Sequence, residues 1–338
     1  MKNKTFKIGK HFVGDNKKVF IIAEIGVNHE GSFKKCVKLF EKAKSSGANA
    51  VKLQTVNPYY NYVKGTRSYK EFQNTDFSDD EFFKLKKIAS KLKLTFLTTP
   101  GSFMEVDRVV KLGSEAIKVS SGLLTNYPLI KYASKKKLPL IISTGMALKK
   151  EIKEAIRSSG TNKKVAILKC TSLYPPPDDA LNLNSISKFK RTFKTVIGYS
   201  DHTTDDLSCL AAVSNGAKII EKHFTLNKKA KGKDHKISLE PNEFKNMVNK
   251  IRRIEIMLGS SEFKINEAEF KNRKTLYRCL VAGKIIFKNE KFSKNNIFLK
   301  RPKPGKRGLE ARFYSSVIGK TSKNKILKDN PILLKNIK

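Results

Sequence analysis

The sequence predicts a (β/α)8 barrel followed by a small second domain. From residue 19 onward, short apolar segments rich in β-branched residues alternate with segments of helical periodicity. Eight such pairs fill about 240 residues, which is the repeat number and size of this barrel class. An open doubly wound sheet is the alternative, but no glycine-rich dinucleotide-binding turn follows the first predicted strand. The barrel is therefore the favoured fold.

The eight predicted strands are short and largely apolar, as expected for parallel strands buried on both faces. In chain order they are residues 19–24, 50–54, 95–98, 116–119, 140–143, 165–169, 196–198 and 218–221. A helix is predicted after each strand, at residues 32–46, 79–92, 103–112, 127–135, 148–158, 185–193, 204–214 and 242–257. Gly47 follows the first helix at the position where a glycine commonly ends one.

Two segments of the expected barrel domain, residues 1–260, fall outside this repeat. Residues 1–18 are polar and basic, and we expect a short hairpin that closes the bottom of the barrel. Residues 56–78 form an insertion rich in Tyr, Asn and Lys without clear periodicity. A loop of this length is usually either functional or disordered.

The second domain is expected at residues 277–338, after a polar linker at residues 261–276. Its segments are short and β-like, at residues 280–282, 297–300 and 317–318, and the run RPKPGKRG interrupts them. About 60 residues make a small core, which needs support from a partner surface. Residues 262–338 carry 21 Lys and Arg against 6 Asp and Glu, a hint that this region faces an anion.

The formal net charge of +40 can indicate binding to nucleic acid. The lysines are nevertheless scattered through every polar segment, and no RNP-like motif, Cys/His finger or Arg-rich arm accompanies them. We interpret the charge mainly as solvated surface that also attracts anionic substrates, and we expect no nucleic-acid partner. A basic nucleic-acid-binding protein remains the non-enzymatic alternative, because it would explain the charge but not the polar strand ends.

Targeting signals are not evident in the sequence. It has no run of about 18 apolar residues and no apolar region near its N-terminus that would indicate a signal peptide. The four cysteines are widely spaced and form no CxxC pair, which fits a reducing compartment. We therefore expect a cytoplasmic protein with no membrane partner.

Two histidines follow two consecutive predicted strands, His202 after residues 196–198 and His223 after residues 218–221. In a barrel, the C-terminal ends of neighbouring strands are adjacent and build the active site. Imidazole nitrogens that converge there are natural ligands for a borderline divalent cation. A single such histidine would more often only cap its strand, but the pair in register favours a metal site.

Polar residues also end the other strands. Lys52 and Lys118 are notable, because a lysine at the end of an apolar strand is costly to desolvate unless an anion binds it. With the hydroxyl groups nearby, the two lysines indicate a site for phosphate or carboxylate. Some of the hydroxyls could simply satisfy strand ends, as for Thr98 and Ser120. The roles of Asp234 and His29, which lie in loops, stay open from residue type alone.

These residues lie in motifs that closely resemble the sialic acid synthase family. The likeness covers nearly the whole chain, with about ten motifs in the family's order and spacing: AEIGVNHEG (23–31), VKLQ (51–54), IKVSSG (117–122), NYPLI (126–130), STGM (143–146), CTSLYP (170–175), GYSDHT (198–203), EKHFT (221–225), GKDHKISLEP (232–241) and LKRPKPG (299–305). The resemblance implies a barrel with a C-terminal antifreeze-like (SAF) domain and a domain-swapped homodimer. It implies a transferase that condenses phosphoenolpyruvate with an N-acetylmannosamine-type sugar to a nine-carbon 2-keto acid.

The family's site residues transfer onto this sequence motif by motif. His202 and His223 would bind the metal, Mn²⁺ or Mg²⁺, and would be catalytic together with Glu24. The residues that would hold phosphoenolpyruvate are Lys52, Thr99, Lys118, Ser121, Ser143 and Ser200. The sugar site would comprise Glu24, Gln54, Tyr174 and Asp234, with Arg301 contributed to the partner subunit's sugar site.

The sequence departs from the family pattern at three places. Leu123 follows the SSG motif where sialic acid synthases usually carry a carboxylate, which suggests a deoxy or diacetamido sugar. Ser172 replaces a frequent asparagine, and Tyr277 is the nearest match to an aromatic residue of the small domain. The alternative enzymatic function is another metal-dependent aldolase-type reaction of pyruvate or phosphoenolpyruvate.

Overall fold

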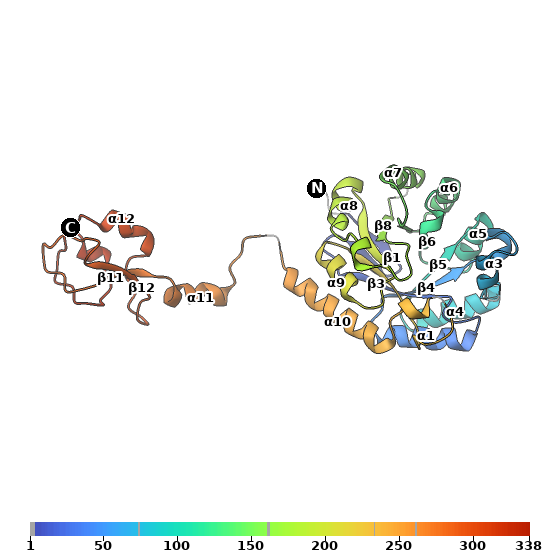
Figure 1. Cartoon of the computed structure of the whole chain (residues 1–338), viewed down its shortest axis with the longest axis horizontal. Helices are drawn as coiled ribbons and strands as arrows, with labels where there is room; N and C mark the ends of the chain where they lie inside the picture. Colours follow the sequence, from blue (N-terminus) through green and yellow to red (C-terminus); the bar gives the residue numbers. More distant parts are fainter. Residues whose placement is uncertain (1–3, 74, 161–162, 233, 261) are drawn as a thin grey trace. The chain divides into compact units, whose positions relative to one another are not determined.

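The computed structural model describes residues 4–73, 75–160, 163–232, 234–260 and 262–338. The chain divides into two compact units, residues 1–259 and residues 260–338. In the first unit a ring of strands is surrounded by helices, as Figure 1 shows. None of the helices in the described residues has both the length and the hydrophobicity needed to span a bilayer.

The predicted barrel is confirmed, because eight parallel strands close into a ring in which the last, β10, pairs with the first, β3. The strands are β3 (Phe20–Gly26), β4 (Ala50–Thr55), β5 (Thr95–Pro100), β6 (Ile117–Val119), β7 (Leu140–Ser143), β8 (Val165–Cys170), β9 (Val196–Asp201) and β10 (Ile219–His223). The helices that follow the strands are α1 (Phe33–Ser45), α4 (Asp79–Lys91), α5 (Phe103–Lys111), α6 (Tyr127–Lys135), α7 (Lys149–Ser158), α8 (Ser185–Phe193), α9 (Leu207–Ser214) and α10 (Pro241–Leu258).

Alternation of side chains along each strand divides the interior into two apolar layers. In β3, Ile21, Ala23 and Ile25 pack outward against the helices. Phe20 and Ile22 instead belong to a separate cluster inside the ring. Glu24 continues this inner series, so the pleat directs its carboxylate into the barrel. The same parity applies in the other strands and determines which polar residues at the strand ends can meet.

The expected N-terminal hairpin is present, formed by β1 (Thr5–Ile8) and β2 (His11–Gly14) in antiparallel pairing. Its buried residues Phe6, Ile8 and Val13 join the apolar cluster inside the ring. That cluster contains the first inner residues of the strands, such as Phe20. The hairpin therefore closes the N-terminal end of the barrel and leaves the opposite end for chemistry.

The second unit contains an antiparallel pair, β11 (Cys279–Ala282) and β12 (Ile297–Lys300), and two short 3-10 helices, at Ala311–Phe313 and Leu334–Asn336. Its buried core consists of Leu280, Ala282, Ile286, Phe292, Ile297, Val317, Ile326 and Ile332. The strand predicted at residues 317–318 is wrong, because α12 (Tyr314–Val317) occupies this segment. Local β-propensity is a weak signal there, and packing of Val317 into the core decides the conformation.

The segment predicted as a linker contains a helix, α11 (Glu267–Leu276). Asn266 caps it by accepting a hydrogen bond from the backbone N–H of Glu269, at 2.7 Å. Acidic residues in its first turn and basic residues in its last turn complement the helix dipole. The helix has no buried residues, which explains why apolar periodicity did not predict it.

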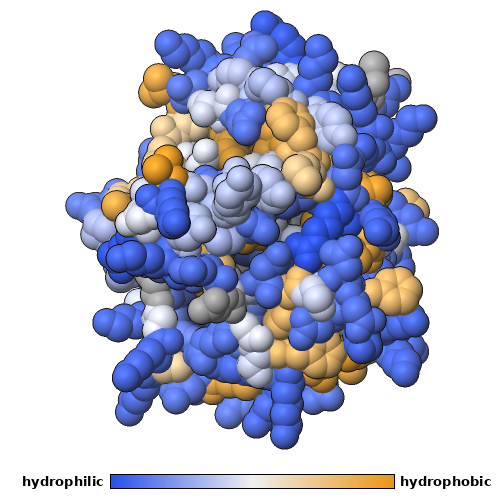
Figure 2. All heavy atoms as spheres, turned by 90° about the vertical axis from the view of Figure 1, so that its right-hand side faces the viewer, coloured by the Kyte–Doolittle hydropathy of each residue, from blue (hydrophilic) through white to orange (hydrophobic). Residues whose placement is uncertain are grey.

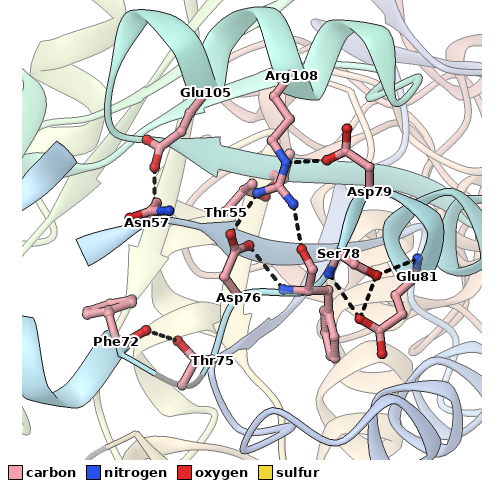
Figure 3. A network of polar contacts seen from close by, with 12 residues as sticks. Thr55, Asn57, Phe72, Thr75, Asp76, Ser78, Asp79, Glu81, Glu105 and Arg108 are labelled. Carbon is pink, nitrogen blue, oxygen red and sulfur yellow. Dashed lines mark hydrogen bonds and ion pairs between the residues drawn. The ribbon is translucent and has the colours of Figure 1, made fainter. Parts of the chain in front are cut away.

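Two short helices, α2 (Pro58–Asn61) and α3 (Arg67–Phe72), lie in the long insertion after β4. The insertion is attached to α5 through polar contacts (Figure 3). Arg108 of α5 donates hydrogen bonds to Asp76 and Asp79, each at 2.7 Å, and also to the carbonyl of Phe77. The insertion is thus held both by charge-assisted hydrogen bonds and by Phe77, which is buried in the apolar core against Phe82. A groove of about 490 Å³ runs beside these contacts.

The surface of the barrel unit carries mainly polar residues on the face shown in Figure 2. The apolar residues on this face lie in separate small patches. Many acidic residues are paired with a basic neighbour, as in Lys84–Asp80 and Arg67–Glu71. Such exposed pairs contribute little to stability, about 0–1 kcal/mol each, and mainly keep the surface solvated.

Candidate active site

Two lysines and two glutamates lie together on the inner face of the barrel. Lys52 Nζ is 2.9 Å from Glu24 Oε2 and 3.4 Å from Glu221 Oε2. Lys118 Nζ is 3.4 Å from the other carboxylate oxygen of Glu221, Oε1. Each of the four side chains is at most 5% exposed. The four charges therefore compensate one another in a pocket where unpaired ions would be very costly.

Burial favours the neutral form of each of these groups, and their mutual attraction opposes it. For Glu221, the charges of Lys118 and Lys52 outweigh burial and hold its pKa at about 2. For Glu24, burial prevails over the attraction of Lys52 and raises the pKa of the carboxyl group. Glu221 is therefore the firmly ionised carboxylate, and Glu24 is the one that takes up a proton more easily.

The pKa values of the two lysines also diverge. Burial lowers the pKa of Lys118. For Lys52, burial acts in the same direction, but the neighbouring carboxylates of Glu221 and Glu24 prevail and raise its pKa. Lys52 is consequently the more firmly charged of the two ammonium groups.

Hydroxyl groups complete this pocket. Lys118 donates a hydrogen bond to Ser143 Oγ at 2.7 Å, and Lys52 donates one to Thr99 Oγ1 at 3.3 Å. Ser200 Oγ donates to the carboxylate of the shared glutamate at 2.9 Å. Ammonium groups flanked by hydroxyls are suited to bind a phosphate or a carboxylate group. The structure thus brings together these five residues, which the family resemblance assigns to phosphoenolpyruvate.

A second group of hydroxyls surrounds Gly145. Its backbone N–H donates to Ser121 Oγ at 3.0 Å. A Cβ atom at this position would lie only 2.0 Å from Ser172 Oγ, so the close approach requires glycine. Ser172 Oγ is buried and has no hydrogen-bond partner among the described residues. A buried hydroxyl with unused hydrogen-bonding capacity is expected where a polar ligand binds.

His202 and His223 lie beside each other, with their ring centroids 5.4 Å apart. His202 Nδ1 is 2.9 Å from the carbonyl oxygen of Thr171, which assigns the ring proton to Nδ1 and leaves Nε2 for a ligand. His223 Nδ1 is buried without a hydrogen-bond partner among the described residues. Burial, reinforced by the nearby His202, lowers the pKa of His223 and favours the neutral imidazole. His223 therefore has the neutral form that binds metals. At His202, burial is outweighed by the contact with Cys170 Sγ, which raises the pKa of the imidazole, so a metal ion would have to compete with a proton there.

The histidine pair fits a divalent cation that retains open coordination positions. Asp234 Oδ2 is 3.8 Å from His223 Nδ1, which exceeds hydrogen-bonding distance. Over the part of the chain that the structure describes, no three His, Cys, Asp or Glu side chains are grouped to hold a metal ion. A metal ion held here would have two imidazole ligands from the described residues, and water or substrate would fill its other positions.

Three residues expected at the sugar site converge on Gly26. A Cβ atom at this position would lie 3.1 Å from Glu24 Oε1, 3.3 Å from Gln54 Nε2 and 3.5 Å from Asp234 Oδ2. The ring of Tyr174 packs against the ring of His202, with centroids 4.1 Å apart, and Tyr174 remains 46% exposed. Polar groups and an aromatic face therefore lie together beside the histidine pair.

Arg301 belongs to the second unit, where it is exposed directly after β12. The two units are described separately, so its role at the sugar site stays a prediction. Tyr277 lies under the guanidinium group of Arg273, 4.8 Å from its ring centroid, and its expected role also stays a prediction. Leu123 packs against the apolar layer between barrel and helices, which explains why an apolar residue is tolerated there.

Glu221 is the site residue to which sequence reasoning assigned no role. It ends a predicted apolar strand, where a glutamate is usually interpreted as solvated. Side chains alternate between the two faces of a strand, so Glu221, two residues before His223, must lie on the same face as His223. This alternation is the signal that could have identified Glu221. The sequence therefore contained the information, but only in combination with the assignment of that face to the barrel interior.

Fold and site together define a barrel protein with a buried cluster of two lysines and two glutamates beside a histidine pair. The family model described as the NeuB family matches residues 39–263 of this chain. The chain belongs to the NeuB family, which confirms the resemblance derived from the motifs.

Individual relatives cover most of the chain. The N,N'-diacetyllegionaminic acid synthase of Campylobacter jejuni is 36% identical over 94% of this chain and 99% of its own length. A pseudaminic acid synthase of the same species is 33% identical, covering 92% of this chain and 94% of its own. The crystal structure of an N-acetylneuraminic acid synthetase from Leptospira borgpetersenii in complex with citrate has a TM-score of 0.77 and 31% identity, covering 81% of this chain and 98% of that one.

Replacement of Glu221 by Gln should lower the free energy of unfolding at pH 7 by about 3 kcal/mol, since both lysines lose their shared counterion. The ionised carboxylate stabilises the fold above its ordinary pKa of 4.5, and this contribution is lost as the pH falls towards about 2. The difference from wild type should therefore shrink below about pH 4.5. Urea unfolding at several pH values measures it.

Glu41→Gln is the matched control, because Glu41 is an exposed residue of α1. This substitution should leave the free energy of unfolding nearly unchanged at every pH. Equal stability of wild type and Glu221→Gln at pH 7 would show that Glu221 does not stabilise the two ammonium groups.

Proposed function

We propose that this chain condenses phosphoenolpyruvate with an N-acetylmannosamine-type sugar, giving a nine-carbon 2-keto acid and inorganic phosphate. The observation that carries the proposal is the pocket of Lys52, Lys118, Glu24 and Glu221 beside the histidine pair. Membership of the NeuB family and relatives named as legionaminic and pseudaminic acid synthases support the same chemistry.

Phosphoenolpyruvate carries its negative charge on a carboxylate and a phosphate group. Lys52 and Lys118 would bind these groups, and the hydroxyls of Thr99, Ser143 and Ser121 would donate to their oxygen atoms. Glu24 and Glu221 hold the two lysines in place, so the cation sites would already be formed when substrate arrives. Such preorganisation reduces the reorganisation that charge stabilisation would otherwise require.

The condensation forms one carbon–carbon bond and breaks one carbon–oxygen bond. C3 of phosphoenolpyruvate attacks the aldehyde carbon of the open-chain sugar, water adds at C2, and the bond from C2 to the phosphate oxygen breaks. A divalent cation bound by His202 and His223, Mn²⁺ or Mg²⁺, would supply Lewis acidity at the sugar aldehyde. Holding both reactants in one pocket can lower the barrier by up to about 7–11 kcal/mol.

Glu24 is our candidate for proton transfer. Its raised pKa lets it exchange a proton more readily than Glu221 can. Its carboxylate accepts a hydrogen bond from Gln54 Nε2 at 3.2 Å, on the side where Asp234 also lies. Glu24 would thus move a proton at the sugar oxygen or at the attacking water.

The remaining expectations from the resemblance belong to the same proposal. The second unit would act as an antifreeze-like domain in a domain-swapped homodimer, and Arg301 would contact the sugar held by the partner subunit. The reaction would take place in the cytoplasm. The sugar is either N-acetylmannosamine or a diacetamido-deoxy analogue, and the absence of a carboxylate at Leu123 favours the second.

Phosphate release from phosphoenolpyruvate tests the function directly. With Mn²⁺ and a panel of mannosamine-type sugars, at least one sugar should give stoichiometric phosphate and 2-keto acid, and a diacetamido-deoxy sugar should give the highest kcat/KM. Product formation from pyruvate without phosphate release would instead indicate an aldolase. No turnover with any sugar of the panel would contradict the proposal.

Replacement of His202 by Ala should remove one of two protein ligands and so weaken Mn²⁺ binding and abolish metal-dependent phosphate release. Mn²⁺ titration followed by electron paramagnetic resonance measures binding independently of turnover. His11→Ala is the control, because His11 belongs to the hairpin at the closed end of the barrel. Unchanged turnover of the His202 variant at saturating Mn²⁺ would refute the ligand role.

Replacement of Arg301 by Ala should raise the KM for the sugar and leave phosphoenolpyruvate affinity intact, because this arginine is proposed to contact only the sugar. A neighbouring exposed cation, Lys303, provides the control variant Lys303→Ala. Steady-state kinetics with each substrate varied in turn separates the two constants. If both constants match those of wild type, the second unit does not contribute Arg301 to the sugar site.

A further inference from the structure

A buried ion pair lies on the outer face of the two strands that lead to the histidines. Asp201 is the last residue of β9 and directly precedes His202, and Lys222 directly precedes His223 in β10. Lys222 Nζ donates to Asp201 Oδ2, and both side chains are completely buried. The Cα atoms of the two residues are register partners in the parallel pairing of β9 with β10. The pair therefore joins the two strands at the point where the histidines emerge.

Hydrogen bonds extend this pair to the residue after His202. The Thr203 backbone N–H donates to Asp201 Oδ1 at 3.1 Å, and the Thr203 hydroxyl donates to Asp201 Oδ2 at 2.8 Å. Lys222 Nζ also donates to the carbonyl oxygen of Thr203. The ammonium group of Lys222 thus contacts the residues before and after His202. Lys222 itself directly precedes His223 in the chain.

We propose that Asp201 and Lys222 form a positioning pair that sets the separation of His202 and His223. The pair lies behind the strands and touches neither substrate nor metal, so it would act only through the two histidines. This inference rests on the proposed metal-binding role of those histidines.

The chemistry of the pair argues for positioning over simple stabilisation. A completely buried ion pair gains little net stability, and apolar residues of similar volume often replace one without loss. Tyr199 and Cys209, which contact Asp201, belong to the apolar outer layer, and the thiol of Cys209 also donates to Asp201 Oδ2 at 3.6 Å. What an ion pair adds over apolar packing is directionality, because the ammonium group must meet particular oxygen atoms. A shift in the register of β9 against β10 would break those contacts.

Tyr199 strengthens the orientation of the carboxylate. Its hydroxyl donates to Asp201 Oδ1 at 2.9 Å from within the same strand. Asp201 therefore accepts hydrogen bonds on both oxygens, and it can turn only if several of them break together. Removal of a group that hydrogen-bonds to a metal ligand typically lowers metal affinity by about 10–100-fold. We take the same range for this pair, which would act on the histidines through the backbone.

The test compares Mn²⁺ affinity of the full chain with that of the double variant Asp201→Asn/Lys222→Met, which removes both charges at similar volume. Electron paramagnetic resonance titration with Mn²⁺ alone should reveal weakening by about 10–100-fold. Binding of phosphoenolpyruvate to the metal-free protein, measured by calorimetry, should be unchanged because Lys52 and Lys118 are untouched. A purely structural defect would weaken both.

The matched control is Lys86→Met/Glu115→Gln. This pair, 2.8 Å apart, lies at the N-terminal ends of the strands, where Glu115 also accepts a hydrogen bond from the N–H of Phe96. Its removal should leave Mn²⁺ affinity unchanged. A folded Asp201/Lys222 double variant that binds Mn²⁺ as tightly as wild type overturns the proposal.

Thr203→Val supplies the test if the double variant does not fold. It removes one hydroxyl contact of Asp201 and keeps both charges, so Mn²⁺ affinity should weaken by roughly three- to tenfold. Unchanged affinity in this variant would likewise overturn the proposal. The variant His202→Ala distinguishes failure of the proposed ligand role from failure of the positioning role. If it binds Mn²⁺ normally, the proposed ligand role fails, whereas if it loses Mn²⁺ while the pair variants do not, only the positioning role fails.

Discussion

Two ammonium and two carboxylate groups buried side by side constrain the whole open end of the barrel. Each lysine would be costly to bury alone, and each glutamate equally so. Together they form a neutral group in which Glu221 serves both lysines and Glu24 serves only Lys52. In the proposed reaction, an anionic substrate would compete for cations that are already in place, which is less demanding than assembling them.

The same strands carry two different kinds of chemistry on their two faces. Along β10, Glu221 and His223 point into the barrel, and Lys222 between them points towards the helices. Along β9, Ser200 faces inward and Asp201 outward. The outer pair links the strands, and the inner residues face the barrel interior. Because side chains alternate along a strand, one short segment can link neighbouring strands on its outer face and present polar residues on its inner face.

Much of the site followed from sequence because a barrel brings all its strand ends to one face. Lys52, Lys118 and the two histidines could be assigned to this face once the eight repeats were recognised. Glu221 escaped because its two lysine partners come from β4 and β6, which are distant in sequence. The helix α11 and the helical conformation of Val317 escaped for a related reason, since neither has a local apolar pattern that distinguishes it.

By itself, the sequence determined the barrel, the order of its strands and the residue types at their ends, because hydrophobic periodicity and glycine or cap positions act locally. The tertiary structure alone decided which of those residues meet. The convergence of Glu24, Gln54 and Asp234 on Gly26, and the link between Asp201 and Lys222, depend on strand register and on the closure of the ring. Register is a property of strands paired through space, and no stretch of neighbouring residues encodes it alone.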